Sequence, residues 1–125
     1  MIKKSLRKKL WKVNLLSKDI PNSRKNVPSY LSNRENKLVR AKLLNENSFK
    51  WVVYRGLEDE LHRFIEYDWD GSIVEYKIHQ DNIRVYNENL VIRNPEVYRY
   101  STESENGKRE MEIINKSGFI RETSI

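Results

Sequence analysis

Lysine and arginine side chains gather at the start of the chain, where their number and spacing suit contact with phosphate groups. The first 50 residues carry 14 basic and 3 acidic side chains, a net charge of +11, and residues 1–18 contain no acid. Each cation that neutralises a phosphate releases condensed counterions, and this contribution grows with the number of contacts. We therefore expect a module that binds nucleic acid, with RNA slightly favoured, or a ribonucleoprotein, mainly through phosphates. The expected contacts are Lys3, Lys4, Arg7, Lys8, Lys9 and Lys12, extended by Arg24, Lys25, Arg34, Lys37, Arg40 and Lys42.

Other interpretations of this basic segment stay open. A lysine-rich helix face is also typical of a solvated surface that docks on the remaining 75 residues, whose net charge is −5. A basic amphipathic helix is typical of binding to an anionic membrane surface, and a basic, acid-poor start is typical of a cleaved organellar presequence. In the nucleic-acid interpretation, Trp11 and Tyr30 would add stacking on unpaired bases.

A second group of residues suits metal-dependent cleavage of phosphodiesters. Glu75 and Lys77 lie on a predicted strand, and Asp68 and Asp70 precede them. Carboxylates can hold Mg²⁺ while a lysine lies near the attacked phosphate. Over about ten residues the pattern resembles the arrangement of restriction-type nucleases, an acid followed by acid-any-lysine on the next strand. The same alternation is typical of a solvent-facing strand, and we predict no metal site.

His62 and His79 form a third group. A metal-independent ribonuclease needs a base, an acid and a cation, which these histidines could supply together with Lys77 and Arg84. A small toxin-like ribonuclease is therefore an alternative function, although histidine on a polar surface is the commoner case. Because none of these patterns is a specific catalytic motif, we expect a protein that is not an enzyme and needs no cofactor.

The acidic, aromatic-rich second part of the chain suggests another alternative, a small protein inhibitor or adaptor that docks on a nucleic-acid-handling protein. Amphipathic aromatic side chains are favoured at protein interfaces when they face outward. They would equally form the core, which we expect for most of them, because few other large apolar residues are present. The residues concerned are Tyr67, Trp69, Tyr76, Tyr86, Tyr98 and Tyr100.

Helical spacing dominates the N-terminal part of the chain. Apolar residues recur every three or four positions over residues 2–16, with lysines mostly on the other side, which predicts a basic amphipathic helix. Residues 18–31 contain two prolines and several polar residues, and we interpret them as a connector. Ser32 and Glu35 have the form of a capping box, which predicts a second helix over residues 33–45.

From Phe49 onward the apolar pattern alternates, as in strands. Residues 57–64 fit one or two helical turns, after which a strand is expected. Asp70-Gly71 is a strong hairpin signal, because glycine supplies the positive φ of a tight turn, and residues 87–89 are a similar signal. The predicted strands cover residues 51–54, 65–69, 73–78, 83–86, 90–93 and 97–100, and a last hairpin pairs 109–114 with 119–123.

Length and composition limit the architecture. A chain of 125 residues, 38% apolar and 34% charged, suits one small domain. The longest apolar run, Trp51 to Tyr54, is too short to cross a membrane, and no apolar stretch resembles a secretory signal. The absence of cysteine excludes disulfides and thiolate metal sites and fits an intracellular, most simply a cytoplasmic, protein.

The expected fold class is α+β. We predict two N-terminal helices packed on a curved antiparallel β-meander or small open barrel. Residues 1–31 would form the basic helix and connector, acting as an arm, and residues 32–125 would form a single α+β domain.

Overall fold

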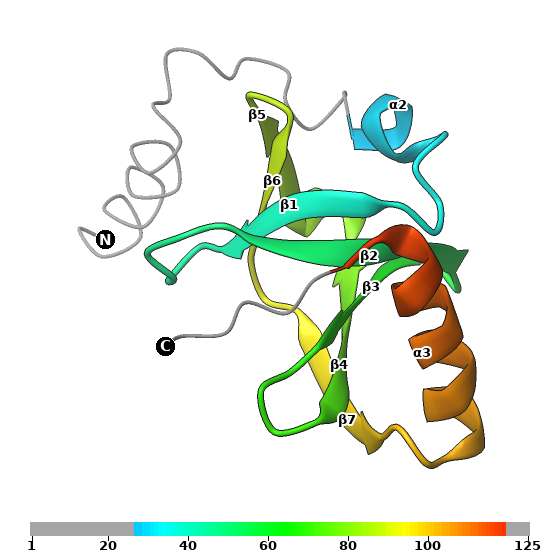
Figure 1. Cartoon of the computed structure of the whole chain (residues 1–125). Helices are drawn as coiled ribbons and strands as arrows, with labels where there is room; N and C mark the ends of the chain where they lie inside the picture. The colour runs from blue at the N-terminus through cyan, green and yellow to red at the C-terminus, as the bar shows by residue number, and fades with distance from the viewer. Residues whose placement is uncertain (1–26, 120–125) are drawn as a thin grey trace.

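A seven-stranded mixed sheet makes up most of the described part of the chain (Figure 1). The computed structural model describes residues 27–119. The predicted helix over residues 2–16 and most of the predicted connector lie outside this range. The elements are α2 (Val27–Leu31), β1 (Leu38–Leu43), β2 (Lys50–Glu58), β3 (Leu61–Tyr67), β4 (Ser72–His79), the 3₁₀ turn η3 (Gln80–Asn82), β5 (Ile83–Tyr86), β6 (Asn89–Ile92), β7 (Glu96–Ser101) and α3 (Glu105–Ser117).

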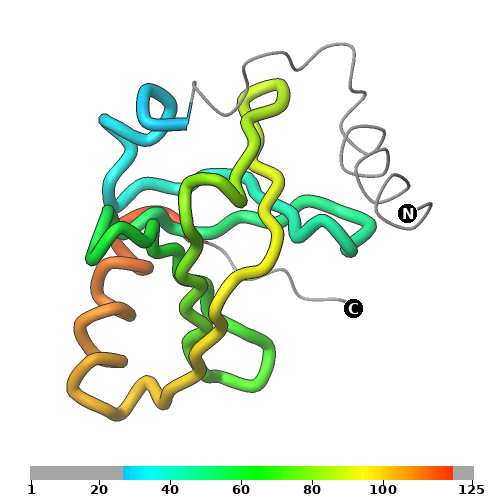
Figure 2. The backbone as a smooth tube through the Cα atoms, turned by 180° about the vertical axis from the view of Figure 1, so that it is seen from behind, coloured from blue at the N-terminus to red at the C-terminus, as the bar shows by residue number. Residues whose placement is uncertain are grey.

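The strands follow the order β5-β6-β1-β2-β3-β4-β7. Neighbouring strands are antiparallel except for β1 and β6, which are parallel. The turn η3 leads the chain from β4, near one edge, to β5 at the other. Seen from behind, the β5–β6 hairpin rises beside α2, while β7 lies toward the opposite end of the sheet (Figure 2).

The main core lies on one face of the sheet, which curls around it. Phe64 and Ile78, from β3 and β4, belong to the same buried cluster as Ile83 and Leu90 from the β5–β6 hairpin. The short helix α2 completes this cluster, and the Tyr30 hydroxyl donates to the Glu88 carbonyl oxygen at 2.8 Å. Strands from both ends of the order therefore enclose one apolar interior. Two α2 residues in the cluster, Val27 and Leu31, come from the end of the predicted connector.

The opposite face of the sheet carries α3. Ile114 of this helix packs against Val53, Ile65 and Ile73 on β2, β3 and β4. The helix begins where the Ser104 hydroxyl accepts the Gly107 N–H and ends at Gly118, which has a φ of 86°. Such a serine cap and left-handed glycine are standard helix boundaries. Within residues 27–119, no helix has the length and apolar character needed to span a membrane.

This architecture corrects the predicted fold class. The described chain is not two N-terminal helices on an antiparallel meander or small open barrel, but mainly a seven-stranded mixed sheet with one helix near the C-terminus and one very short helix before β1. The parallel contact between β1 and β6 joins strands that are about 50 residues apart in the sequence. Hydrophobic periodicity carries no information about such a pairing.

The second predicted helix, over residues 33–45, is wrong, because this segment contains β1. Val39 and Ala41 face the main core, whereas Leu38 packs on the α3 side. A strand buried on both faces has no polar alternation and imitates the crowded pattern of a helix. The capping box does not form either, since the Ser32 hydroxyl donates to the Ser29 carbonyl oxygen.

Two other predicted elements are also wrong. The helical turns expected over residues 57–64 are the end of β2, a two-residue turn and the start of β3. Asp59 and Glu60 adopt φ values of 50° and 68°, a conformation usually left to glycine or asparagine. The predicted strand over residues 109–114 belongs to α3, and most of its expected partner, residues 119–123, lies outside the described range.

The turns with the clearest local signal are confirmed. Asp70-Gly71 joins β3 to β4, and Gly71 has a φ of 84°. Asn87 and Glu88 join β5 to β6, both with positive φ. These turns bring β3 and β4 into register and close the β5–β6 hairpin, which sets the positions of the side chains described below.

Candidate nucleic-acid interface

Two of the predicted phosphate-binding residues lie side by side on β1. Arg40 and Lys42 are two positions apart on the strand and therefore leave the same face of the sheet. Arg40 is directly opposite Trp51 on β2, and Lys42 is directly opposite Val91 on β6. Directly opposed residues share a face, so strand pairing brings an indole next to Arg40, on the face that also carries Lys42.

Phe49, at the end of the β1–β2 turn, forms cation–π contacts with both Arg40 and Lys42. The guanidinium carbon of Arg40 lies 5.2 Å from the centre of the Phe49 ring, and the Lys42 ammonium lies 5.8 Å from it. Phe49 itself packs against buried Val91. An aromatic face attracts a cation without neutralising its charge. We call Arg40, Lys42, Phe49 and Trp51 the β1 patch.

No carboxylate neutralises the β1 patch within residues 27–119. Neither Arg40 nor Lys42 takes part in an ion pair with the described residues. Glu46, in the β1–β2 turn, accepts the Leu43 N–H at 3.1 Å and lies 3.6 Å from the Lys50 ammonium. The one acid in this turn is thus already engaged elsewhere.

The other predicted phosphate contacts do not join the β1 patch. Arg34 covers the ring of Tyr30, with its guanidinium carbon 4.0 Å from the ring centre, and donates to the Tyr30 carbonyl oxygen. Lys37 is exposed in the turn before β1. The remaining predicted contacts, Lys3, Lys4, Arg7, Lys8, Lys9, Lys12, Arg24 and Lys25, and the predicted stacking residue Trp11, lie outside the described residues.

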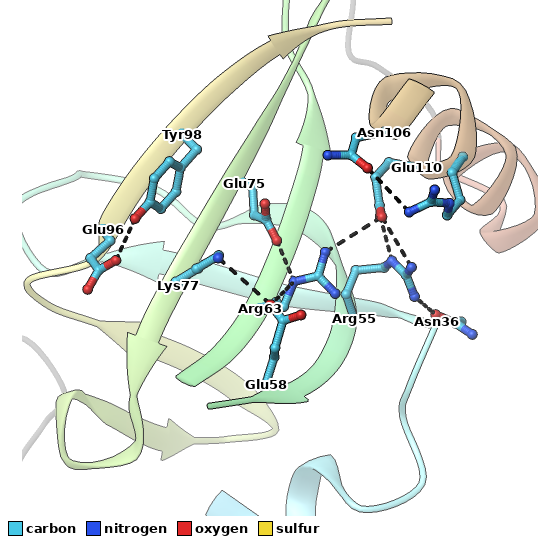
Figure 3. Close-up of polar contacts among 11 residues, drawn as sticks. Asn36, Arg55, Glu58, Arg63, Glu75, Lys77, Glu96, Tyr98, Asn106 and Glu110 are labelled. Atoms are coloured by element: carbon cyan, nitrogen blue, oxygen red, sulfur yellow. Dashed lines mark hydrogen bonds and ion pairs between the residues drawn. The ribbon is translucent and has the colours of Figure 1, made fainter. Parts of the chain in front are cut away.

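Further along the same face, beneath α3, charged side chains are paired with one another (Figure 3). Arg55 and Arg63 converge on Glu110 of α3: Nη2 of Arg55 donates to Glu110 Oε2 at 3.2 Å, and Nη2 of Arg63 lies 3.6 Å from the same oxygen. The Nε of Arg63 donates to Glu75 on β4. We call these four residues the α3 cluster. Both carboxylates are buried and each has an arginine partner.

The nuclease-like residues do not form one site, because Glu75 and Lys77 lie among these paired charges whereas Asp68 and Asp70 lie in the β3–β4 turn. Glu75 is held by Arg63, and the Lys77 ammonium lies 3.8 Å from Glu58 (Figure 3). Asp70 accepts hydrogen bonds from Ser72 in the β3–β4 turn. Among residues 27–119, no group of three or more histidine, aspartate or glutamate side chains is placed to hold a metal ion.

The two histidines leave opposite faces of the sheet. His62 lies opposite Ile78, whereas His79 is the next residue on β4 and points to the other side. His62 is only 4% exposed, and its Nδ1 forms a hydrogen bond with the Tyr54 hydroxyl in the main core at 2.8 Å. Burial lowers the pKa of His62. His79 is exposed and accepts the Asp81 N–H at the start of η3. The structure does not bring them together as an acid–base pair.

The aromatic residues divide between core and surface. Tyr76 is buried and donates to Glu66, which also binds the Lys50 ammonium at 2.9 Å. Tyr98, by contrast, is exposed on the edge strand β7, and Trp69 is exposed in the β3–β4 turn. Tyr67, Tyr86 and Tyr100 are partly buried.

Sequence reasoning identified Arg40 and Lys42 but missed Phe49 and Trp51 as part of the same surface. The alternation that starts at Phe49 places these two aromatics on one face, but only the β1–β2 register places them beside the cations.

Comparisons with models of protein families, with curated proteins and with solved structures found no significant match.

Proposed function

We propose that the protein binds nucleic acid through phosphate contacts from the basic N-terminal segment and from the β1 patch. The observation that carries the proposal is the difference in how cations are partnered. Arg40 and Lys42 contact an aromatic ring, and a cation without a carboxylate remains available to a phosphate. Five cations on β2, β3, β4 and β7 instead have carboxylate partners: Lys50, Arg55, Arg63, Lys77 and Arg99.

The distribution of net charge supports the same proposal. Residues 27–119 carry 14 basic and 16 acidic side chains, so the described part of the chain is slightly negative. Residues 1–26 carry 9 basic and 1 acidic side chain. Attraction of a polyanion to this protein therefore depends on the N-terminal segment and on local cation groups, rather than on the surface as a whole.

The test compares two triple variants of the full chain that remove the same charge. One replaces Lys3, Lys4 and Lys8 by glutamine, and the other replaces Lys108, Arg109 and Lys116, which are exposed on α3. Binding of a labelled oligonucleotide is followed by fluorescence anisotropy over a range of salt concentrations. For the natural chain, the logarithm of affinity should fall linearly with the logarithm of salt concentration.

The N-terminal triple variant should reduce the steepness of this salt dependence by about 2, since each lost phosphate contact removes about 0.7 to 0.9. The α3 triple variant should leave it near the natural value, although it changes net charge equally. Equal effects of both variants, or no binding by the natural chain at low salt, would contradict the proposal.

A further inference from the structure

Trp51 is an open side chain on the face of the sheet that carries Arg40. It lies near the start of β2, where this strand pairs with β1 and the ladder with β3 has not yet begun, and 51% of its surface is exposed. In Figure 1 the start of β2 and the β1–β2 turn extend away from α3, which covers the other end of the strand. The exposed indole therefore lies beside Arg40, near the end of β2 that α3 does not cover.

The two cations on the face of Trp51 differ in exposure: Arg40 is exposed, whereas Lys42 is mostly buried. Lys42 is only 9% exposed, so its hydrocarbon stem is buried, while its ammonium is held near the Phe49 ring. Arg40 lies over the same ring from the adjacent position on that face. The patch thus offers an exposed indole next to Arg40, with the Lys42 ammonium near the adjoining Phe49 ring and no carboxylate pairing either cation within the described residues.

This combination of groups suits unpaired nucleic acid. A duplex hides the faces of its bases and presents mainly phosphates, whereas a single strand presents bases that can stack on an aromatic ring next to its phosphates. We infer that Trp51 stacks on a base of single-stranded nucleic acid while Arg40 and Lys42 contact the flanking phosphates. This inference rests on the proposed function and names the form of nucleic acid that the β1 patch selects.

Trp69 provides a matched comparison within the same molecule. It is exposed to a similar extent, 56%, but lies in the β3–β4 turn between Asp68 and Asp70. Both carboxylates would repel a phosphate, although Arg99 forms ion pairs with them. An indole in this acidic setting should not support binding of a polyanion, so replacing it controls for the loss of a generic exposed tryptophan.

The experiment measures the affinity of the full chain for a labelled single strand of about 16 nucleotides and for a duplex of the same sequence. Trp51→Ala, Trp51→Phe and Trp69→Ala are compared with the natural chain at one salt concentration. Trp51→Ala should weaken single-strand binding about 5- to 150-fold, the range expected for one lost stacking contact. Trp51→Phe should retain much of the affinity, and Trp69→Ala should retain nearly all of it.

Duplex binding separates this inference from the proposed function. It should be nearly unchanged in Trp51→Ala and weakened in the N-terminal triple variant. If Trp51→Ala leaves single-strand affinity unchanged, or lowers duplex affinity equally, the stacking inference is wrong while nucleic-acid binding stands. If the natural chain binds neither probe, the proposed function itself fails. Denaturation midpoints confirm that each variant is folded.

Discussion

One face of the sheet carries two charged regions that differ in almost every respect. In the α3 cluster, Arg55 and Arg63 lie beneath a helix and are matched by Glu75 and Glu110. In the β1 patch, the cations lie beyond the helix and contact a ring. Burial explains the contrast between Arg55, whose side chain is 11% exposed, and exposed Arg40, because a charge removed from water is costly unless a partner compensates it, whereas an exposed charge needs none. Lys42 is buried as well, but its neighbour is the Phe49 ring rather than a carboxylate. Ion pairing thus distinguishes cations that serve the fold from cations available to a ligand.

Removing a carboxylate from the α3 cluster should have the largest effect. Glu110→Ala leaves Arg55 without its carboxylate partner, with a side chain that is only 11% exposed. Breaking a buried pair in this way costs about 3 to 5 kcal/mol, so the free energy of unfolding should fall by about 3 kcal/mol. Urea denaturation measures the change.

The control for this variant is Glu112→Ala, an exposed acid on the same helix, which should change stability by less than about 0.5 kcal/mol. Trp51→Ala in the β1 patch should also have a small effect on stability. If Glu110→Ala and Glu112→Ala were equally stable, the ion pairs of the α3 cluster would not stabilise the fold. The proposed difference in role between the α3 cluster and the β1 patch would then be wrong.

The difference between the regions also explains which parts of the fold can be predicted from sequence. Asp70-Gly71 was predictable because its turn depends on a local property, the positive φ of Gly71. The turn at Asp59 and Glu60 was not, because the surrounding strands impose the same backbone conformation on residues that rarely adopt it.

The same limit applies to the candidate site. Arg40 and Lys42 were predictable as cations, since charge is visible in the sequence. That β1 is a strand, and that Trp51 lies opposite Arg40, depends on pairing with distant strands. Conversely, the spacing of Glu75 and Lys77 suggested a catalytic pair. The ion pair of Glu75 with Arg63 could not be foreseen, because Arg63 lies twelve residues earlier on another strand.

Acidification should affect the core that supports both regions. Burial lowers the pKa of His62, so the folded state binds fewer protons than the unfolded state, whose histidine pKa is about 6.5. Stability should therefore fall as the pH drops below about 6.5 toward the folded-state pKa, by at most about 1.4 kcal/mol per pH unit. Urea denaturation between about pH 7 and 5 measures this dependence.

His62→Gln should flatten that pH dependence, because the titrating group is gone while a polar partner for Tyr54 remains. His79→Gln, which replaces the exposed histidine, should change it only slightly, because the charge of His79 lowers the pKa of His62 less than burial does. Equal slopes in His62→Gln and the natural chain would show that another group causes the dependence. In either case, binding measurements for the β1 patch belong near neutral pH, where the core is most stable.

The smallest expected effect compares two arginines on the surface. Arg40→Gln removes a cation without a carboxylate partner, whereas Arg99→Gln removes one that is paired with Asp68. Both variants change the net charge equally. Arg40→Gln should weaken single-strand binding a few-fold and lower the steepness of the salt dependence by about 0.7, as for one lost phosphate contact. Arg99→Gln should do neither, because it exposes a carboxylate far from the β1 patch rather than removing a contact. Arg40→Lys should keep the salt dependence, since it preserves the charge. Equal losses of affinity in Arg40→Gln and Arg99→Gln would mean that ion pairing does not determine which cations contact the ligand.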